Sequence, residues 1–125
     1  MLLPEPIRRG VEHFNAGEYF EAHEAWEGHW GRGPPAERAL TMGLIKAAVA
    51  LLHLTAGNEA GFLWQAEKAI PRLRENGAIW PELDVAALGD ALESLASQWR
   101  FHGHVPPGTV LPLVGEHQRT SSQES

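Results

Sequence analysis

The sequence predicts a single all-α domain, a bundle of about five helices. Two observations carry this prediction. Apolar side chains recur at three- and four-residue spacing along most of the chain, which is the helical period. No stretch before the C-terminal tail alternates convincingly between apolar and polar residues, as a half-buried strand would. Glycine, proline and asparagine interrupt the helical pattern at short intervals, which indicates short loops between packed helices.

The first two helices are expected to form an antiparallel hairpin at the N-terminus. The first covers about residues 6–15, with Pro6 near its first position and Asn15-Ala16-Gly17 at its end. The second runs over about residues 18–30, and its early glutamates favour a helix N-terminus. The glycine- and proline-rich run 31–35 then ends it.

The third helix is expected over about residues 36–56. It is apolar almost all round, which is typical of the buried central helix of a bundle. Gly57-Asn58 follows it, and both residue types tolerate the left-handed conformation that ends helices. The sequence therefore predicts that this helix lies at the centre of the fold.

Two more helices complete the expected bundle. The fourth covers residues 59–75, and Pro71 inside it removes a backbone donor, so we expect a kink or a break there. The fifth covers about residues 85–101 with Asp84 as its N-cap. Leucines and a tryptophan follow at spacings of four, three and four residues, so one face of this helix is expected in the core.

The C-terminal tail differs in composition from the helical part. We therefore divide the chain into an all-helical domain, residues 1–102, and an extended to disordered tail, residues 103–125. Within the tail, residues 105–114 contain prolines and no helical period, which favours an extended segment. Residues 115–125 are polar and serine-rich, a composition that predicts disorder.

Composition excludes several kinds of site and partner. The chain has 125 residues and no cysteine, so disulfides, thiol catalysis and cysteine-ligated metal sites are excluded. Its net charge of −6 argues against binding to nucleic acid or to an anionic membrane. The N-terminus lacks a signal-peptide pattern, and the longest apolar stretch, 47–54, is shorter than the roughly 20 residues that span a membrane. We therefore expect a cytoplasmic protein.

Chemistry-bearing residues concentrate on the second helix. His23 and Glu27 lie about 40° apart around it, on the same side as most of its aromatic residues, so we expect both on the inward face. A four-residue spacing suits two ligands of one divalent metal ion. His53, which interrupts the apolar third helix, is the best remote third ligand. Glu24 lies at the margin of that face and is a candidate general base beside the ion, as in metal-assisted hydrolysis.

A structural interpretation of the same pair stays open. His23 and Glu27 would then form a hydrogen-bond network in the core, with Glu27 paired to a neighbouring helix or to Lys46. The other histidines are expected on solvated faces (His13 and His29) or at the end of the fifth helix (His102 and His104). The remaining tryptophans are expected in the core: Trp64, Trp80 and Trp99.

The second helix carries a motif that resembles a known family. The run 14–30 contains His-x-x-x-Glu-x-x-Trp, formed by His23, Glu27 and Trp30, and resembles the signature of the domain of unknown function 309 family. The similarity continues through residues 43–48 and 56–61 and covers about residues 5–75. The resemblance implies a small all-helical prokaryotic protein whose motif is suspected of binding metal, with no established activity.

The first two helices are also similar to one tetratricopeptide repeat, which is a helix–turn–helix unit of about 34 residues. This resemblance implies that Tyr19 and Ala22 lie at the contact between the two helices. It rests on the spacing of six residues: Gly10, Gly17, Tyr19, Ala22, Trp26 and Pro34.

Two hypotheses of different classes follow. In the first, His23, Glu27 and His53 hold a divalent metal ion of unknown identity, with Glu24 beside it. In the second, the chain is a non-catalytic helical-hairpin module that binds a partner protein. The sequence does not decide whether the chain is an enzyme. The partner is an unknown protein or small molecule, and the aromatic surface of the helices makes a homo-oligomer plausible.

Overall fold

The computed structural model describes residues 3–106 and 108–116, and over these residues the chain is an all-α bundle, as predicted. Two very short strands accompany the helices, β1 (Leu83–Asp84) and β2 (Gly115–Glu116). In the described part of the chain there are five helices: α1 (Glu5–Asn15), α2 (Tyr19–His29), α3 (Pro35–Thr55), α4 (Glu59–Glu75) and α5 (Val85–His102).

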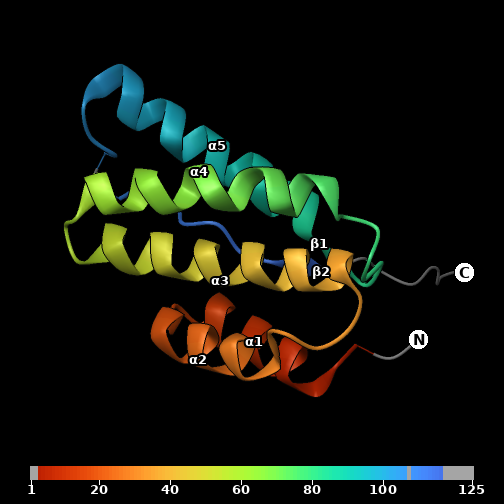
Figure 1. Ribbon diagram of the computed structural model, residues 1–125. Helices are drawn as coiled ribbons and strands as arrows, with labels where there is room; N and C mark the ends of the chain where they lie inside the picture. The colour runs from red at the N-terminus through yellow and green to blue at the C-terminus, as the bar shows by residue number, and fades with distance from the viewer. Residues whose placement is uncertain (1–2, 107, 117–125) are drawn as a thin grey trace, which may run out of the picture.

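The central helix is α3, as its all-round apolar sequence predicts. Figure 1 shows it between the α1–α2 pair on one side and α4 on the other, with α5 packed outside α4. Its alanines allow neighbouring helices to approach closely, and Gly43 lies directly under α4, where a Cβ atom would come 2.9 Å from the Cβ of Arg72. Leu40, Leu44 and Leu51 are fully buried.

By length and composition alone, α3 is also the one described helix that could cross a membrane. Half of its most apolar window is buried inside the fold. Core helices of bundles meet the same criterion, because they too are apolar on most sides. The burial of α3 between α2 and α4 therefore accounts for its composition.

The helix ends lie within one residue of the predicted positions. Side-chain caps explain two of them. The side chain of Asn58 accepts a hydrogen bond from the Gly61 N–H at 3.0 Å at the start of α4, and Asp84 accepts one from the Ala87 N–H at 3.1 Å at the start of α5. Of the kink or break expected at Pro71, the break is absent, since α4 runs unbroken from Glu59 to Glu75.

The α1–α2 hairpin is closed by one close aromatic contact. The indole of Trp26 lies against Gly10, where a Cβ atom would come 2.1 Å from Nε1, so only glycine fits there without a shift. That Nε1–H donates to the carbonyl oxygen of Ile7 at 3.2 Å. Phe14 packs edge-on against Tyr19 with ring centroids 5.2 Å apart. Tyr19 and Ala22 are both buried, and the contact with Phe14 places Tyr19 against α1.

The segment after α5 returns along the bundle and is fastened at its end. Asn15, the last residue of α1, donates to the Val114 carbonyl at 3.0 Å and accepts from the Val114 N–H at 2.8 Å. Val114 is buried, and β2 pairs antiparallel with β1 just after it. Gly115 and Glu116, at the start of the stretch predicted to be disordered, are thus in a strand. The rest of that stretch, residues 117–125, lies outside the described residues.

Candidate functional site

The orientation of α2 differs from the prediction. Its core-facing residues are Tyr19, Ala22, Trp26 and His29. Of the side predicted to face inward, Tyr19 and Trp26 are buried, and the rest is partly or well exposed. We call the exposed part the motif face, and it consists of Phe20, His23, Glu27 and Trp30, spaced by three, four and three residues.

The aromatic residues of the motif face are well exposed. Phe20 retains 53% of its accessible surface and Trp30 retains 48%. The expectation that the whole aromatic side of α2 packs inward is therefore wrong. The core selects Trp26, because Gly10 on α1 leaves room for its indole ring, whereas Trp30, one turn further on, is the C-cap of α2.

His23 and Glu27 form the polar centre of the motif face. The Nε2 atom of His23 lies 3.3 Å from the Oε2 atom of Glu27, and the side chains are 23% and 56% exposed. The other ring nitrogen, Nδ1, lies 3.7 Å from Oε2 of Glu24. The ring of Phe20 lies beside the imidazole, with centroids 6.2 Å apart. One imidazole thus stands between two carboxylates at the protein surface.

His53 lies elsewhere in the fold. It lies in the last turn of α3, where its Nδ1 atom is 3.3 Å from the side-chain amide nitrogen, Nδ2, of Asn58. Among residues 3–106 and 108–116 there is no group of three or more His, Cys, Asp or Glu side chains that could hold a metal ion. The structure therefore brings His23, Glu24 and Glu27 together on α2 and leaves His53 apart from them.

The closed-core arrangement of the structural hypothesis is not observed either. Glu27 is more than half exposed, and its ion pair in the described structure is with His23 and not with Lys46. A buried strut would need a partner on a neighbouring helix. The His23–Glu27 pair lies within one helix, so it does not fasten α2 to another element.

The histidine that links α2 to a neighbouring helix is His29, which was predicted on a solvated face. Its Nε2 lies 3.4 Å from Oε2 of Glu37 in the first turn of α3, with side-chain exposures of 10% and 21%. The predicted exposure of His29 was wrong because the residue that pairs with it, Glu37, lies on the next helix. The short connection 30–34 brings Glu37 back over the end of α2, and a carboxylate eight residues after a histidine was the available signal.

The remaining candidates differ in burial. His13 pairs with Glu18 at 2.7 Å between α1 and α2, and Nδ1 of His104 lies 3.1 Å from the carbonyl of His102. Trp80 is in the core as expected. Trp64 is 62% exposed, contrary to expectation, and the ammonium of Lys68 lies 3.7 Å from its ring centroid.

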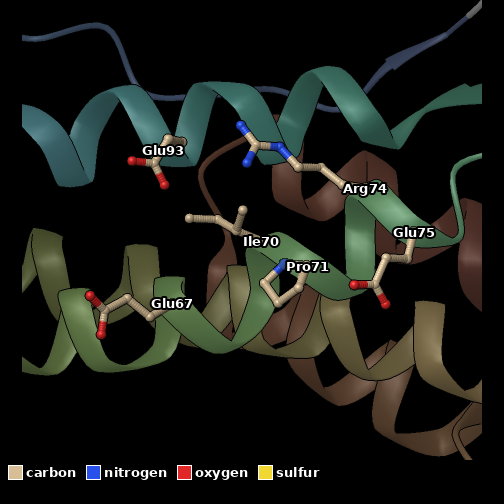
Figure 2. A pocket seen from close by; sticks show the side chains of 6 residues that line it. All are labelled: Glu67, Ile70, Pro71, Arg74, Glu75 and Glu93. Atoms are coloured by element: carbon tan, nitrogen blue, oxygen red, sulfur yellow. The ribbon is translucent and has the colours of Figure 1, made fainter.

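A separate hollow of about 420 Å³ lies beside α4 and α5. Figure 2 shows Ile70 and Pro71 on α4 within it and the charged side chains around them. Most of those charges are already paired: Arg74 with Asp90 at 2.8 Å, and Arg100 with Glu67 and Glu93, both at 3.0 Å. Since the pairs neutralise most of its rim, the motif face is the stronger candidate site.

Comparison with known proteins points to the same part of the chain. Residues 7–64 match a family model described as Domain of unknown function (DUF309). This span includes α2 with the complete motif face and ends within α4. No curated protein and no solved structure matches the chain.

Proposed function

Since residues 7–64 match a family model whose description assigns no activity, we propose that His23 and Glu27 bind a divalent metal ion at the surface of α2. One observation carries the proposal. The two potential ligand atoms, Nε2 and Oε2, are 3.3 Å apart. Two ligands of a tetrahedral ion, each about 2.0–2.1 Å from it, are separated by about 3.3 Å. The pair therefore needs little rearrangement to hold one ion.

Glu24 has a positioning role in this proposal. It lies at Nδ1, the ring nitrogen that points away from Glu27. Histidine ligands commonly donate their second N–H to a carboxylate, which fixes the ring and the tautomer. Glu24 is thus better placed to orient His23 than to act as the general base that the sequence suggested.

Two side chains leave most of the coordination shell open. Water or a ligand atom of a bound molecule would fill the remaining positions, because His53 does not reach the pair. A divalent ion there would act as a Lewis acid, which is the chemistry used in metal-assisted hydrolysis. Imidazole and carboxylate together favour zinc and similar transition ions over calcium or magnesium.

Calorimetric titration of untagged, chelator-treated protein with zinc chloride tests this proposal. Wild-type protein should bind one zinc ion per chain, and Glu27→Gln should weaken binding at least tenfold, because an amide is a poorer ligand than a carboxylate. Glu24→Gln should weaken it less. The stability of Glu27→Gln should change by less than about 0.5 kcal/mol, since the pair is exposed.

Two matched variants serve as controls. Glu21→Gln removes another exposed carboxylate of α2 that is not part of the pair, and His53→Gln removes the remote histidine. Both should bind zinc as wild type does. Equal affinity in Glu27→Gln and wild type would refute the site, and a loss in His53→Gln would show that a third ligand comes from α3.

A protein-interaction function is the second candidate, and a specific observation favours it. Phe20 and Trp30, at the two ends of the motif face, are large aromatic side chains that remain about half exposed. Aromatic residues are enriched where proteins bind one another. In this form the helical hairpin presents α2 to a partner, and the His23–Glu27 pair is part of the contact surface.

A further inference from the structure

The exposed surface of α2, which includes the motif face, is strongly acidic. Residues 18–30 contain four glutamates, at positions 18, 21, 24 and 27, and no lysine or arginine. All four are exposed. In the described structure the ion pairs of Glu18, Glu24 and Glu27 are with histidines only. The surface of α2 therefore carries an excess of negative charge next to two exposed aromatic rings.

A shallow hollow adjoins this acidic surface. It has a volume of about 330 Å³ and lies between α1 and α2. Phe20 and Ala25 give it an apolar part, and Glu21 and Glu24 lie on the α2 side. Arg9 and His13 line it on the α1 side. An apolar side chain fits beside Phe20, and a cation fits toward the glutamates.

Another exposed tryptophan of the same chain shows which group complements such a surface. Trp64 on α4 is 62% exposed, and Lys68 from the next turn places its ammonium 3.7 Å from the ring centroid. This cation–π contact satisfies the aromatic face. Phe20 and Trp30 have glutamates for neighbours along α2 and no lysine or arginine within the helix. Helix α2 itself thus supplies no cation for either ring.

We propose that the motif face docks a basic amphipathic helix of a partner protein. Lysine or arginine side chains of that helix would lie over the rings of Phe20 and Trp30 and pair with Glu24 and Glu27. One of its apolar side chains would enter the hollow beside Phe20. This inference rests on the second candidate function and does not require a metal ion.

The same charge distribution disfavours other occupants. A second copy of the chain docked through its own motif face would bring Glu24 and Glu27 of both copies together. Nucleic acid and anionic lipid would be repelled for the same reason. An uncharged apolar helix would leave the glutamates without counter-charges. A partner with interleaved basic and apolar residues satisfies both the charge and the aromatic surface.

Fluorescence anisotropy with labelled synthetic helices tests the proposal. The probe is a 14-residue amphipathic peptide with leucine on one face and lysine and arginine on the other. The controls are the same composition in scrambled order and a version with glutamate for each basic residue. The native-order basic peptide should bind the full chain in the presence of EDTA, and binding should weaken as salt is raised. Neither control peptide should bind comparably.

Protein variants locate the contact. Phe20→Ser combined with Trp30→Ser should weaken peptide binding at least about tenfold, as expected for aromatic anchors. Trp64→Ser removes a still more exposed tryptophan outside the motif face and should leave binding unchanged. Zinc binding by the Phe20/Trp30 double variant should also be unchanged, which separates this proposal from the metal site.

Several outcomes would overturn the inference. They are absence of binding by the native-order peptide, equal binding of the scrambled peptide, and equal loss of affinity in Trp64→Ser. Tight binding of the acidic control would show that the face binds proteins of a different charge, which leaves the second candidate function standing and refutes the partner class. Sedimentation of the wild type as a dimer that the Phe20/Trp30 variant abolishes would identify a second copy as the occupant.

Discussion

The two faces of α2 contain nearly the same residue types, but their side chains contact different parts of the molecule. The inner face has Tyr19, Trp26 and a histidine, His29, paired with a glutamate. The motif face has Phe20, Trp30 and a histidine, His23, also paired with a glutamate. The difference is the origin of the partners. Inside, the glutamate comes from α3 and the indole acceptor comes from α1, whereas outside the glutamate comes from α2 itself.

Because of this difference, we expect the inner face of α2 to contribute to the stability of the fold and the motif face to contribute to binding. Contacts that join elements contribute to the free energy of folding, because they are lost when the chain unfolds. An exposed pair within one helix contributes only about 0.3–0.5 kcal/mol. Its side chains can therefore change partners at little cost to the fold. The inner face should respond strongly to substitution in stability measurements, and the motif face should respond in binding measurements.

The largest expected effect is that of Trp26→Ala. It removes a fully buried indole and its hydrogen bond to Ile7, and should lower the free energy of unfolding by about 3–5 kcal/mol. Trp30→Ala on the motif face is the matched control and should change it by less than about 1 kcal/mol. Urea denaturation followed by circular dichroism measures both. Similar losses in the two variants would break the distinction between the faces.

A smaller effect is expected from Gly10→Ala. The added methyl group would collide with the Trp26 indole, and such overpacking costs about 1–3 kcal/mol. Gly28→Ala is the control, since a Cβ atom at Gly28 meets nothing within 4 Å. This exposed helical glycine should gain about 0.5–1 kcal/mol from the better helix former. Opposite signs for the two substitutions in thermal denaturation would sharpen the comparison, whereas a neutral Gly10→Ala would contradict the close contact.

The smallest effect concerns pH. Burial raises the pKa of the Tyr19 hydroxyl above its usual value, so the folded state holds the neutral form more firmly than the unfolded state does. Its contribution to stability is complete below the unfolded pKa of about 10 and is lost as pH rises through the folded pKa. Tyr19→Phe should therefore lose less stability than wild type at alkaline pH. Parallel curves for the two proteins would show that Tyr19 ionises freely when folded.

Helix positions followed from local sequence, and the rotation of α2 did not. Helix ends depend on nearby residues such as Asn58 and Asp84, whose side chains cap the following helices. The rotation of α2 depends on a neighbour: its aromatic residues span a broad side of the helix, and the indole of Trp26 fills the space left by Gly10 on α1. Within the candidate site, the pairing of His23 with Glu27 was predictable from their spacing, whereas its exposure was not.

The exposure of Trp64 could have been predicted from a nearby lysine. Tryptophan is mostly buried in folded proteins, so residue type alone predicts Trp64 in the core. The lysine four residues later lies on the same side of the helix, so it can cover an exposed ring. Spacing to a cation thus carries information about exposure that residue type alone does not.

The double hydrogen bond between Asn15 and Val114 has a consequence for how the chain folds. Most helix contacts join neighbours in sequence, α1 to α2, α2 to α3, α3 to α4 and α4 to α5, so these pairs can assemble with short loop closures. A stack of that kind can open from either end like a repeat array. Asn15 and Val114 are 99 residues apart, and their contact closes the stack into a loop. Because this contact joins α1 to the segment that follows α5, unfolding of α1 should be coupled to unfolding of the C-terminal part of the bundle.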